Sequence, residues 1–157
     1  MARKARKKPV ETYALFIFEI TDWEPSYGLS VNGSRYNDAA FSEIYALHID
    51  TVCRHPPKVA GRTANFSLYG ERGFMEPPDW QRDRNWRPNS VAHLELPASG
   101  GRCYARLPQE SMGTLLTALA HQRFRYVSLH GSPLARGHSL CWSIEFSRNE
   151  DLGDEPA

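Results

Sequence analysis

Residues 102–146 read RCYARLPQESMGTLLTALAHQRFRYVSLHGSPLARGHSLCWSIEF, and they decide the fold class. Near both ends of this stretch apolar and polar residues alternate, with the period of two that indicates a half-buried β-strand. The apolar positions at the two ends are Cys103, Ala105 and Leu107, then Leu140, Trp142, Ile144 and Phe146. A third alternation over residues 124–128 predicts one more strand between them.

Between the strand patterns at residues 103–107 and 124–128 the apolar residues change to the spacing of a helix. Met112, Leu115, Leu116 and Leu119 stand at i, i+3, i+4 and i+7, which places them in one apolar stripe. Pro108 suits the first turn of a helix, because its missing N–H would have no partner there. The pattern therefore predicts an amphipathic helix over about residues 109–121.

The preceding part of the chain adds further strand patterns. Residues 12–20, 43–53, 66–70 and 91–96 are rich in β-branched, aromatic or alternating apolar residues. Residues 22–33, which include Trp23 and Tyr27, are expected to form a loop or a short irregular strand, with both aromatic rings at the edge of the core. The sequence thus predicts an α+β fold, with a mainly antiparallel sheet or sandwich of about six or seven strands and one helix packed across it. Much of the core is expected to come from Leu115, Leu119, Phe124, Tyr126, Trp142, Ile144 and Phe146.

Length and charge predict one domain with two polar ends. A chain of 157 residues is the usual size of one domain, and its 41% hydrophobic and 24% charged residues are ordinary globular values. We expect a disordered basic N-terminal segment at 1–9, a globular α+β domain at 10–148 and a disordered acidic tail at 149–157. The net charge of +1 argues against a uniformly basic surface for nucleic acid.

The cysteines point to a reducing compartment. Cys53, Cys103 and Cys141 are odd in number and far apart, so we expect buried free thiols and a cytoplasmic location. No apolar run approaches the roughly 20 residues that span a bilayer, and we expect neither membrane association nor a signal peptide. Outside residues 1–9 the one lysine is Lys58, a bacterial-like genome bias towards arginine.

The long aperiodic segment 71–90 is the strongest candidate for a binding surface. Trp, Arg and Tyr dominate protein–protein hot spots, and aromatic rings with guanidinium groups also bind single-stranded nucleic acid. The candidate residues are Arg72, Phe74, Trp80, Arg82, Arg84, Trp86 and Arg87. Four carboxylates in the same segment cancel the four arginines, so a protein partner is favoured over nucleic acid. A self-paired loop with its tryptophans against the sheet explains the same residues.

Histidines supply a second hypothesis. If the last two strands pair with His130 opposite His138, both imidazoles could reach one metal ion. Such a site needs at least a third ligand, and no neighbouring sequence motif provides one, so two partly exposed histidines at a hairpin mouth are the simpler interpretation. His48 and Asp50 are two apart on one strand, so the carboxylate could orient the imidazole for base catalysis. Cys53 with His55 could form a thiol–imidazole pair.

Three functions follow from these candidates. The favoured one is a non-enzymatic protein-interaction or accessory module, with a protein partner or a second copy of the chain, and without a cofactor. A small metal- or histidine-dependent enzyme at His130 and His138 is the alternative, and no phosphate-binding loop or hydrolase elbow suggests other chemistry. A nucleic-acid-associated protein is the third, and its phosphate contacts would come from Arg3, Lys4, Arg6, Lys7 and Lys8.

Overall fold

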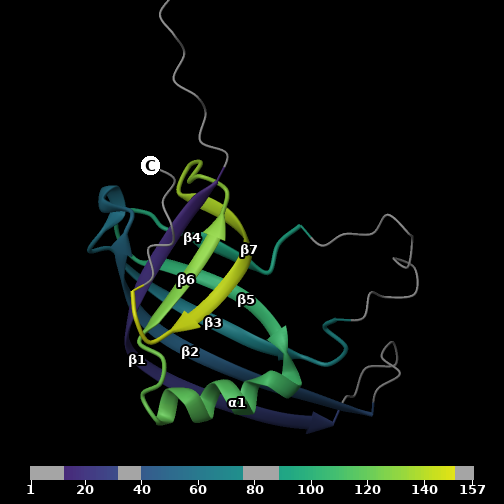
Figure 1. The fold of residues 1–157 in the computed structure, drawn as a ribbon. Coiled ribbons are helices and arrows are strands. Elements are labelled where there is room, and N and C mark those ends of the chain that lie inside the picture. The colour runs from purple at the N-terminus through teal and green to yellow at the C-terminus, as the bar shows by residue number, and fades with distance from the viewer. Residues whose placement is uncertain (1–12, 32–39, 76–88, 151–157) are drawn as a thin grey trace, which may run out of the picture.

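The computed structural model describes residues 13–31, 40–75 and 89–150, and within them seven strands and one α-helix form a barrel (Figure 1). The basic segment 1–9 and residues 151–157 lie outside this description. In chain order the elements are β1 (Ala14–Val31), β2 (Phe41–His55), a 3₁₀ turn (Pro57–Val59), β3 (Thr63–Glu71), β4 (Ala92–Glu95), β5 (Gly101–Pro108), α1 (Gln109–Ala120), β6 (Tyr126–Gly131) and β7 (His138–Ser147).

The sheet closes on itself in the order β1-β2-β3-β5-β4-β7-β6, and β6 pairs with β1. All neighbours are antiparallel except β3 and β5, which are parallel. The prediction of an α+β fold, with a mainly antiparallel sheet of about six or seven strands and one helix, is therefore confirmed in its broad terms. The sheet is closed into a barrel, however, and its β3–β5 pair makes it mixed. Alternation in a sequence shows which face of a strand is apolar, and it carries no signal for the partner or for closure.

The core fills the barrel with side chains that point inward from all seven strands. Phe18 and Phe66 meet there edge to face, with ring centroids 5.0 Å apart. The predicted helix is confirmed, and α1 lies across one end of the barrel (Figure 1) with Met112, Leu115 and Leu119 buried. The helix approaches β3 closely at Gly70, where a Cβ atom would lie 3.0 Å from the Met112 side chain.

A β-bulge in β7 overturns part of the predicted core. His130 pairs with Ser143 but Gly131 pairs with Cys141, so Trp142 has no partner on β6 and the alternation shifts by one residue. Ile144, beyond the bulge, packs against the core as expected, whereas Trp142 is 49% exposed. Of the other expected core residues, Leu115, Leu119 and Tyr126 are buried, and Phe124 and Phe146 are half-buried.

The first strand is longer than predicted. β1 continues through residues 22–31, so Trp23 and Tyr27 lie in a strand and not in a loop. Cys53, Cys103 and Cys141 are free and fully buried, as expected for small apolar residues. Among the described residues no helix has the length and apolarity to cross a membrane.

Candidate functional site: an apolar arm and a histidine cluster

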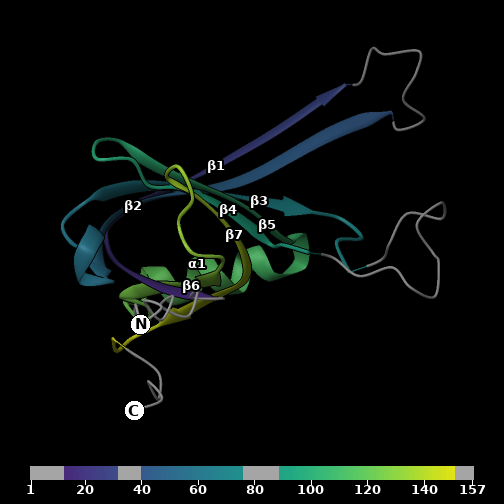
Figure 2. The same cartoon turned by 90° about the horizontal axis from the view of Figure 1, so that it is seen from above.

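Strands β1 and β2 run together beyond the barrel as a two-stranded ribbon (Figure 2). β6 pairs with β1 only over residues 14–19, and β3 pairs with β2 only over residues 46–52. Residues 27–31 of β1 and 41–45 of β2 therefore pair with each other and, in the described chain, with no other strand. We call these ten residues the arm.

One face of the arm continues the core-facing row of the barrel. Along β2 the alternation that buries Ile49 and Leu47 runs on through Tyr45 and Glu43 to Phe41. Directly opposite on β1 the same face carries Tyr27, Leu29 and Val31. Tyr45 and Glu43 in this row are half-buried, but four apolar side chains of the row are left exposed: Tyr27 at 59%, Leu29 at 60%, Val31 at 77% and Phe41 at 62%.

A carboxylate in the middle of this face ties the arm to the barrel. Glu43 accepts hydrogen bonds from the Tyr27 hydroxyl at 2.7 Å, from Arg72 Nη2 at 3.1 Å and from the Gln109 amide. These bonds, chiefly the one from Tyr27, lower the pKa of Glu43, and the same bond raises the pKa of Tyr27. The arm is thus joined to the first residue of α1 and to the residue that follows β3.

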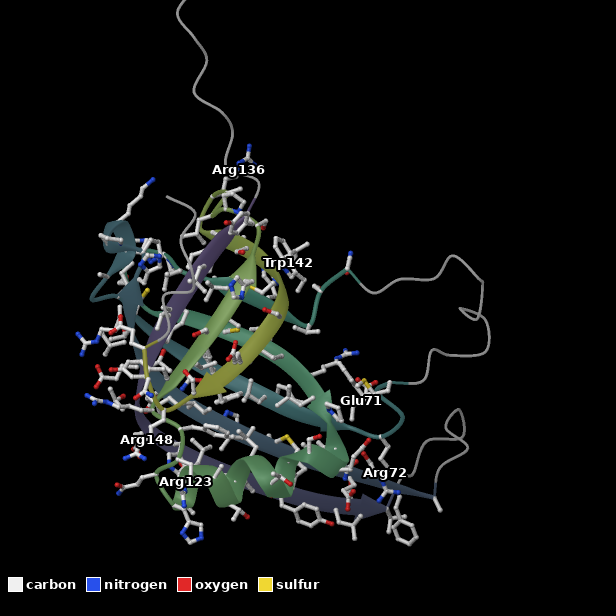
Figure 3. All side chains as sticks on the ribbon, in the orientation of Figure 1. Glu71, Arg72, Arg123, Arg136, Trp142 and Arg148 are labelled. Atoms are coloured by element: carbon white, nitrogen blue, oxygen red, sulfur yellow. The ribbon has the colours of Figure 1, made fainter. Side chains whose placement is uncertain are left out.

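The arm and the predicted binding segment meet at this point. An open hollow is lined by Leu29 and Phe41 from the arm, by residues 70–72 and by Gln109. Glu71 and Arg72 lie beside the end of the arm (Figure 3). Of the predicted binding residues, Arg72 is exposed and paired with Glu43, and Phe74 is half-buried. The rest lie outside the described residues, namely Trp80, Arg82, Arg84, Trp86 and Arg87.

The histidine pairing predicted for the last hairpin is wrong. His130 lies opposite Ser143, and its Nδ1 is 3.1 Å from the Ser143 hydroxyl. His138 begins β7 directly after a tight turn at Arg136 and Gly137, both with positive φ, and it lies opposite Glu95 on β4. β6 continues through Gly131, and the bulge in β7 shifts the register further.

His138 instead joins a cluster on the outer wall of the barrel. His93 and Glu95 stand two apart on β4, so both side chains point away from buried Leu94. The Nε2 atom of His93 is 3.1 Å from Nδ1 of His138, and Glu95 Oε1 is 3.9 Å from the same Nδ1. The three ligand-type atoms lie within 4.8 Å of one another, and among the described residues no other group of three or more such side chains lies so close.

A neighbouring arginine holds the carboxylate of this cluster. Arg102 on β5 donates from Nε to Glu95 Oε2 at 2.8 Å, which leaves Oε1 facing the imidazoles. The hydrogen bond from Arg102 lowers the pKa of Glu95, and the two histidines act in the same direction. Glu95 is therefore a carboxylate at neutral pH, an anionic oxygen beside two imidazole nitrogens.

The other sequence candidates have separate partners. His48 lies 3.3 Å from the Ser67 hydroxyl, whereas the Asp50 carboxylate accepts a hydrogen bond from the Asn65 amide at 2.7 Å. The Cys53 thiol is buried and donates to the His55 carbonyl oxygen at 3.3 Å. Burial raises the pKa of Cys53 to about 11, which opposes formation of a nucleophilic thiolate.

Sequence reasoning missed His93 and Glu95. Their signal is a His-x-Glu alternation inside a short strand, which gains meaning only when β7 lies beside β4. No family model, curated protein or solved structure matches this chain. The geometry of these two surfaces is therefore the basis for assigning a function.

Proposed function

We propose that this chain is a non-enzymatic protein-interaction module whose contact surface is the apolar face of the arm, together with the start of the 71–90 segment at Arg72. The observation that carries the proposal is the continuation of a core-facing apolar row past the end of the core. The partner is a protein surface that presents apolar side chains to Tyr27, Leu29, Val31 and Phe41.

The energetics favour a covered arm. Burying a large apolar side chain that was exposed contributes about 1.5–3 kcal/mol, and this face carries four of them, of which Val31 and Phe41 lie directly opposite each other. Contiguous apolar surface on a folded protein commonly marks an interaction site. Inside the barrel the core requires this alternation, whereas among the described residues no core lies against Leu29, Val31 and Phe41 in the arm.

The charges of the arm favour protein over nucleic acid. Residues 27–31 and 41–45 contain the carboxylate of Glu43 and neither lysine nor arginine. Arg72, the nearest described cation on this face, is already paired with Glu43. A phosphate backbone would therefore find no free positive charge on the arm, whereas an apolar protein surface needs none.

The backbone of the arm adds a second kind of contact. Both strands present an outer edge that pairs with no other strand in the described chain. An extended segment of a partner can add to such an edge through main-chain hydrogen bonds while its side chains pack on the apolar face. The free, buried thiols suit a reducing cytoplasm as the place where the module works.

Site-specific photo-crosslinking in the native host tests this proposal. A photoreactive residue at Leu29 should give discrete crosslinks to a protein, and the same residue at Leu140, an equally apolar and 49% exposed position on β7, should not give them. The substitution Phe41→Ser should abolish the Leu29 crosslinks without altering the circular dichroism spectrum, because Phe41 packs against no core residue.

The partner in the crosslink decides the result. A crosslink to another protein, or to a second copy of the chain, supports the proposal and identifies the occupant. A crosslink within the same chain to residues 76–88 would mean that the protein covers its own arm. That result, or equal crosslinking from Leu29 and Leu140, would refute the interaction surface.

A further inference from the structure

We propose that His93, Glu95 and His138 form a binding site for a divalent transition metal of the zinc type on the outer wall of the barrel. Two imidazoles and one carboxylate are a donor set that Zn²⁺ accepts, with a fourth position left for water or another ligand. This site is independent of the arm, because it shares no residue with it.

The distances between the donor atoms fit a metal. A zinc ion about 2.0–2.1 Å from two imidazole nitrogens, at a tetrahedral angle, holds those nitrogens about 3.3 Å apart. The separation of 3.1 Å between His93 Nε2 and His138 Nδ1 is close to this value. Glu95 Oε1 lies 3.9 Å from His138 Nδ1 and no more than 4.8 Å from the other ligand atom, so it has to approach the two nitrogens by roughly 0.5–1.5 Å to bind the same ion.

The fold holds all three ligands on paired backbone. β4 lies between β5 and β7, with Glu95 directly opposite His138. The turn at Arg136 and Gly137 fixes the first residue of β7, and the Gly137 carbonyl accepts a hydrogen bond from the Leu96 amide at 2.8 Å. Such a frame reduces the ordering that metal binding would otherwise have to impose.

The neighbourhood resembles that of a metal ligand set. Arg102 binds the distal oxygen of Glu95, in the way that outer hydrogen bonds orient ligating carboxylates. His138 is 52% exposed, so the open coordination position faces solvent. His93 is flanked on the same outer face by Leu140 and Tyr104, which a molecule bound at that position would contact.

Metal titration of the chelator-treated full-length protein tests the site. Zn²⁺ binding followed by calorimetry should show one equivalent, and Co²⁺ should give the visible absorption of a four-coordinate nitrogen and oxygen site. Each of His93→Ala, His138→Ala and Glu95→Gln should weaken binding by roughly a hundredfold. His130→Ala is the matched control, since it removes an imidazole that lies outside the cluster, 3.1 Å from the Ser143 hydroxyl, and it should leave the affinity unchanged.

A second readout separates loss of a ligand from loss of the fold. Saturating Zn²⁺ should raise the melting temperature of the wild type and of His130→Ala, but not of His93→Ala, since a ligand that binds only the folded state stabilises it. If a histidine variant does not fold, Glu95→Gln takes its place in this comparison, because glutamine has nearly the same size as glutamate and can still form hydrogen bonds. Absence of one-to-one binding in the wild type, or equal affinity in His93→Ala, His138→Ala and His130→Ala, would overturn the site.

Discussion

Gly131 is the position where one added methyl group should cost most. It pairs with Cys141 at the bulge, and its absent side chain leaves room for the facing strand. A Cβ atom at Gly131 would lie 2.6 Å from the Leu140 carbonyl oxygen, 2.8 Å from Cys141 Sγ and 2.8 Å from Ser139 Oγ. The Leu140 oxygen belongs to the backbone and cannot rotate away, so β6 and β7 would have to separate locally.

The expected cost of Gly131→Ala follows from this crowding. Overpacking a tight interior costs about 1–3 kcal/mol, and the value here should lie at the upper end, about 3 kcal/mol, because backbone must move. The loss also includes the hydrogen bond from the Ser132 amide to the Leu140 oxygen, 2.9 Å long, if that carbonyl is displaced. Urea unfolding followed by circular dichroism measures the free energy of unfolding directly.

Gly113→Ala is the matched control for this substitution. Gly113 lies on the exposed side of α1, and an added Cβ meets no atom within 4 Å. Alanine is about 1 kcal/mol more favourable than glycine inside a helix, so this variant should be more stable than wild type. If Gly131→Ala unfolds within about 0.5 kcal/mol of wild type while Gly113→Ala behaves as expected, the close approach of β6 and β7 is refuted.

Two further outcomes follow from ionisable groups. Glu19 accepts hydrogen bonds from Arg54 at 2.8 Å and from Arg125 at 3.1 Å, and these bonds lower its pKa. Its contribution to stability is therefore present above the pKa of the unfolded state and is lost as pH falls through the pKa of the folded state. Glu19→Gln should therefore lower stability at pH 7 and leave it unchanged near pH 2, as urea midpoints would show; an equal deficit at both pH values would contradict the assignment. The Cys53 thiol, with its pKa raised to about 11 by burial, should resist alkylation at pH 8 until urea unfolds the chain, and rapid modification of native protein, mapped by mass spectrometry, would show that this strand opens.

Local patterns in the sequence predicted the local structure well. The stripe of Met112, Leu115 and Leu119 predicted α1 to within a residue of its C-terminal end, because one buried face at helical spacing has few other solutions. The strand pattern over residues 43–53 likewise predicted β2, in which Leu47 and Ile49 are buried. These signals involve residues close in sequence and depend little on the remaining fold.

Those local patterns could not predict the register of the strands or which strands are neighbours in the sheet. The bulge at Trp142 inserts one residue, and because side chains alternate with a period of two, a single insertion exchanges the faces beyond it. An alternating row from Leu140 to Phe146 therefore looked like one apolar face although its two halves point to opposite sides. Nothing local distinguishes the two cases, since the insertion is defined by the partner strand.

The arm and the histidine cluster could not be predicted for the same physical reason: both depend on elements that are far apart in the sequence. A strand pattern states that one face is apolar, but what covers that face depends on elements far away in the chain, so Leu29 and Phe41 carry a core-like pattern without a core. Likewise, His93 and Glu95 gain a third ligand only because β4 lies beside β7, strands that are separated in sequence by β5, α1 and β6. Closure of the barrel creates that neighbourhood. A variant that disturbs the β4–β7 pairing should therefore affect the histidine cluster, while the arm, held by Glu43 to α1 and to the residue after β3, should keep its geometry.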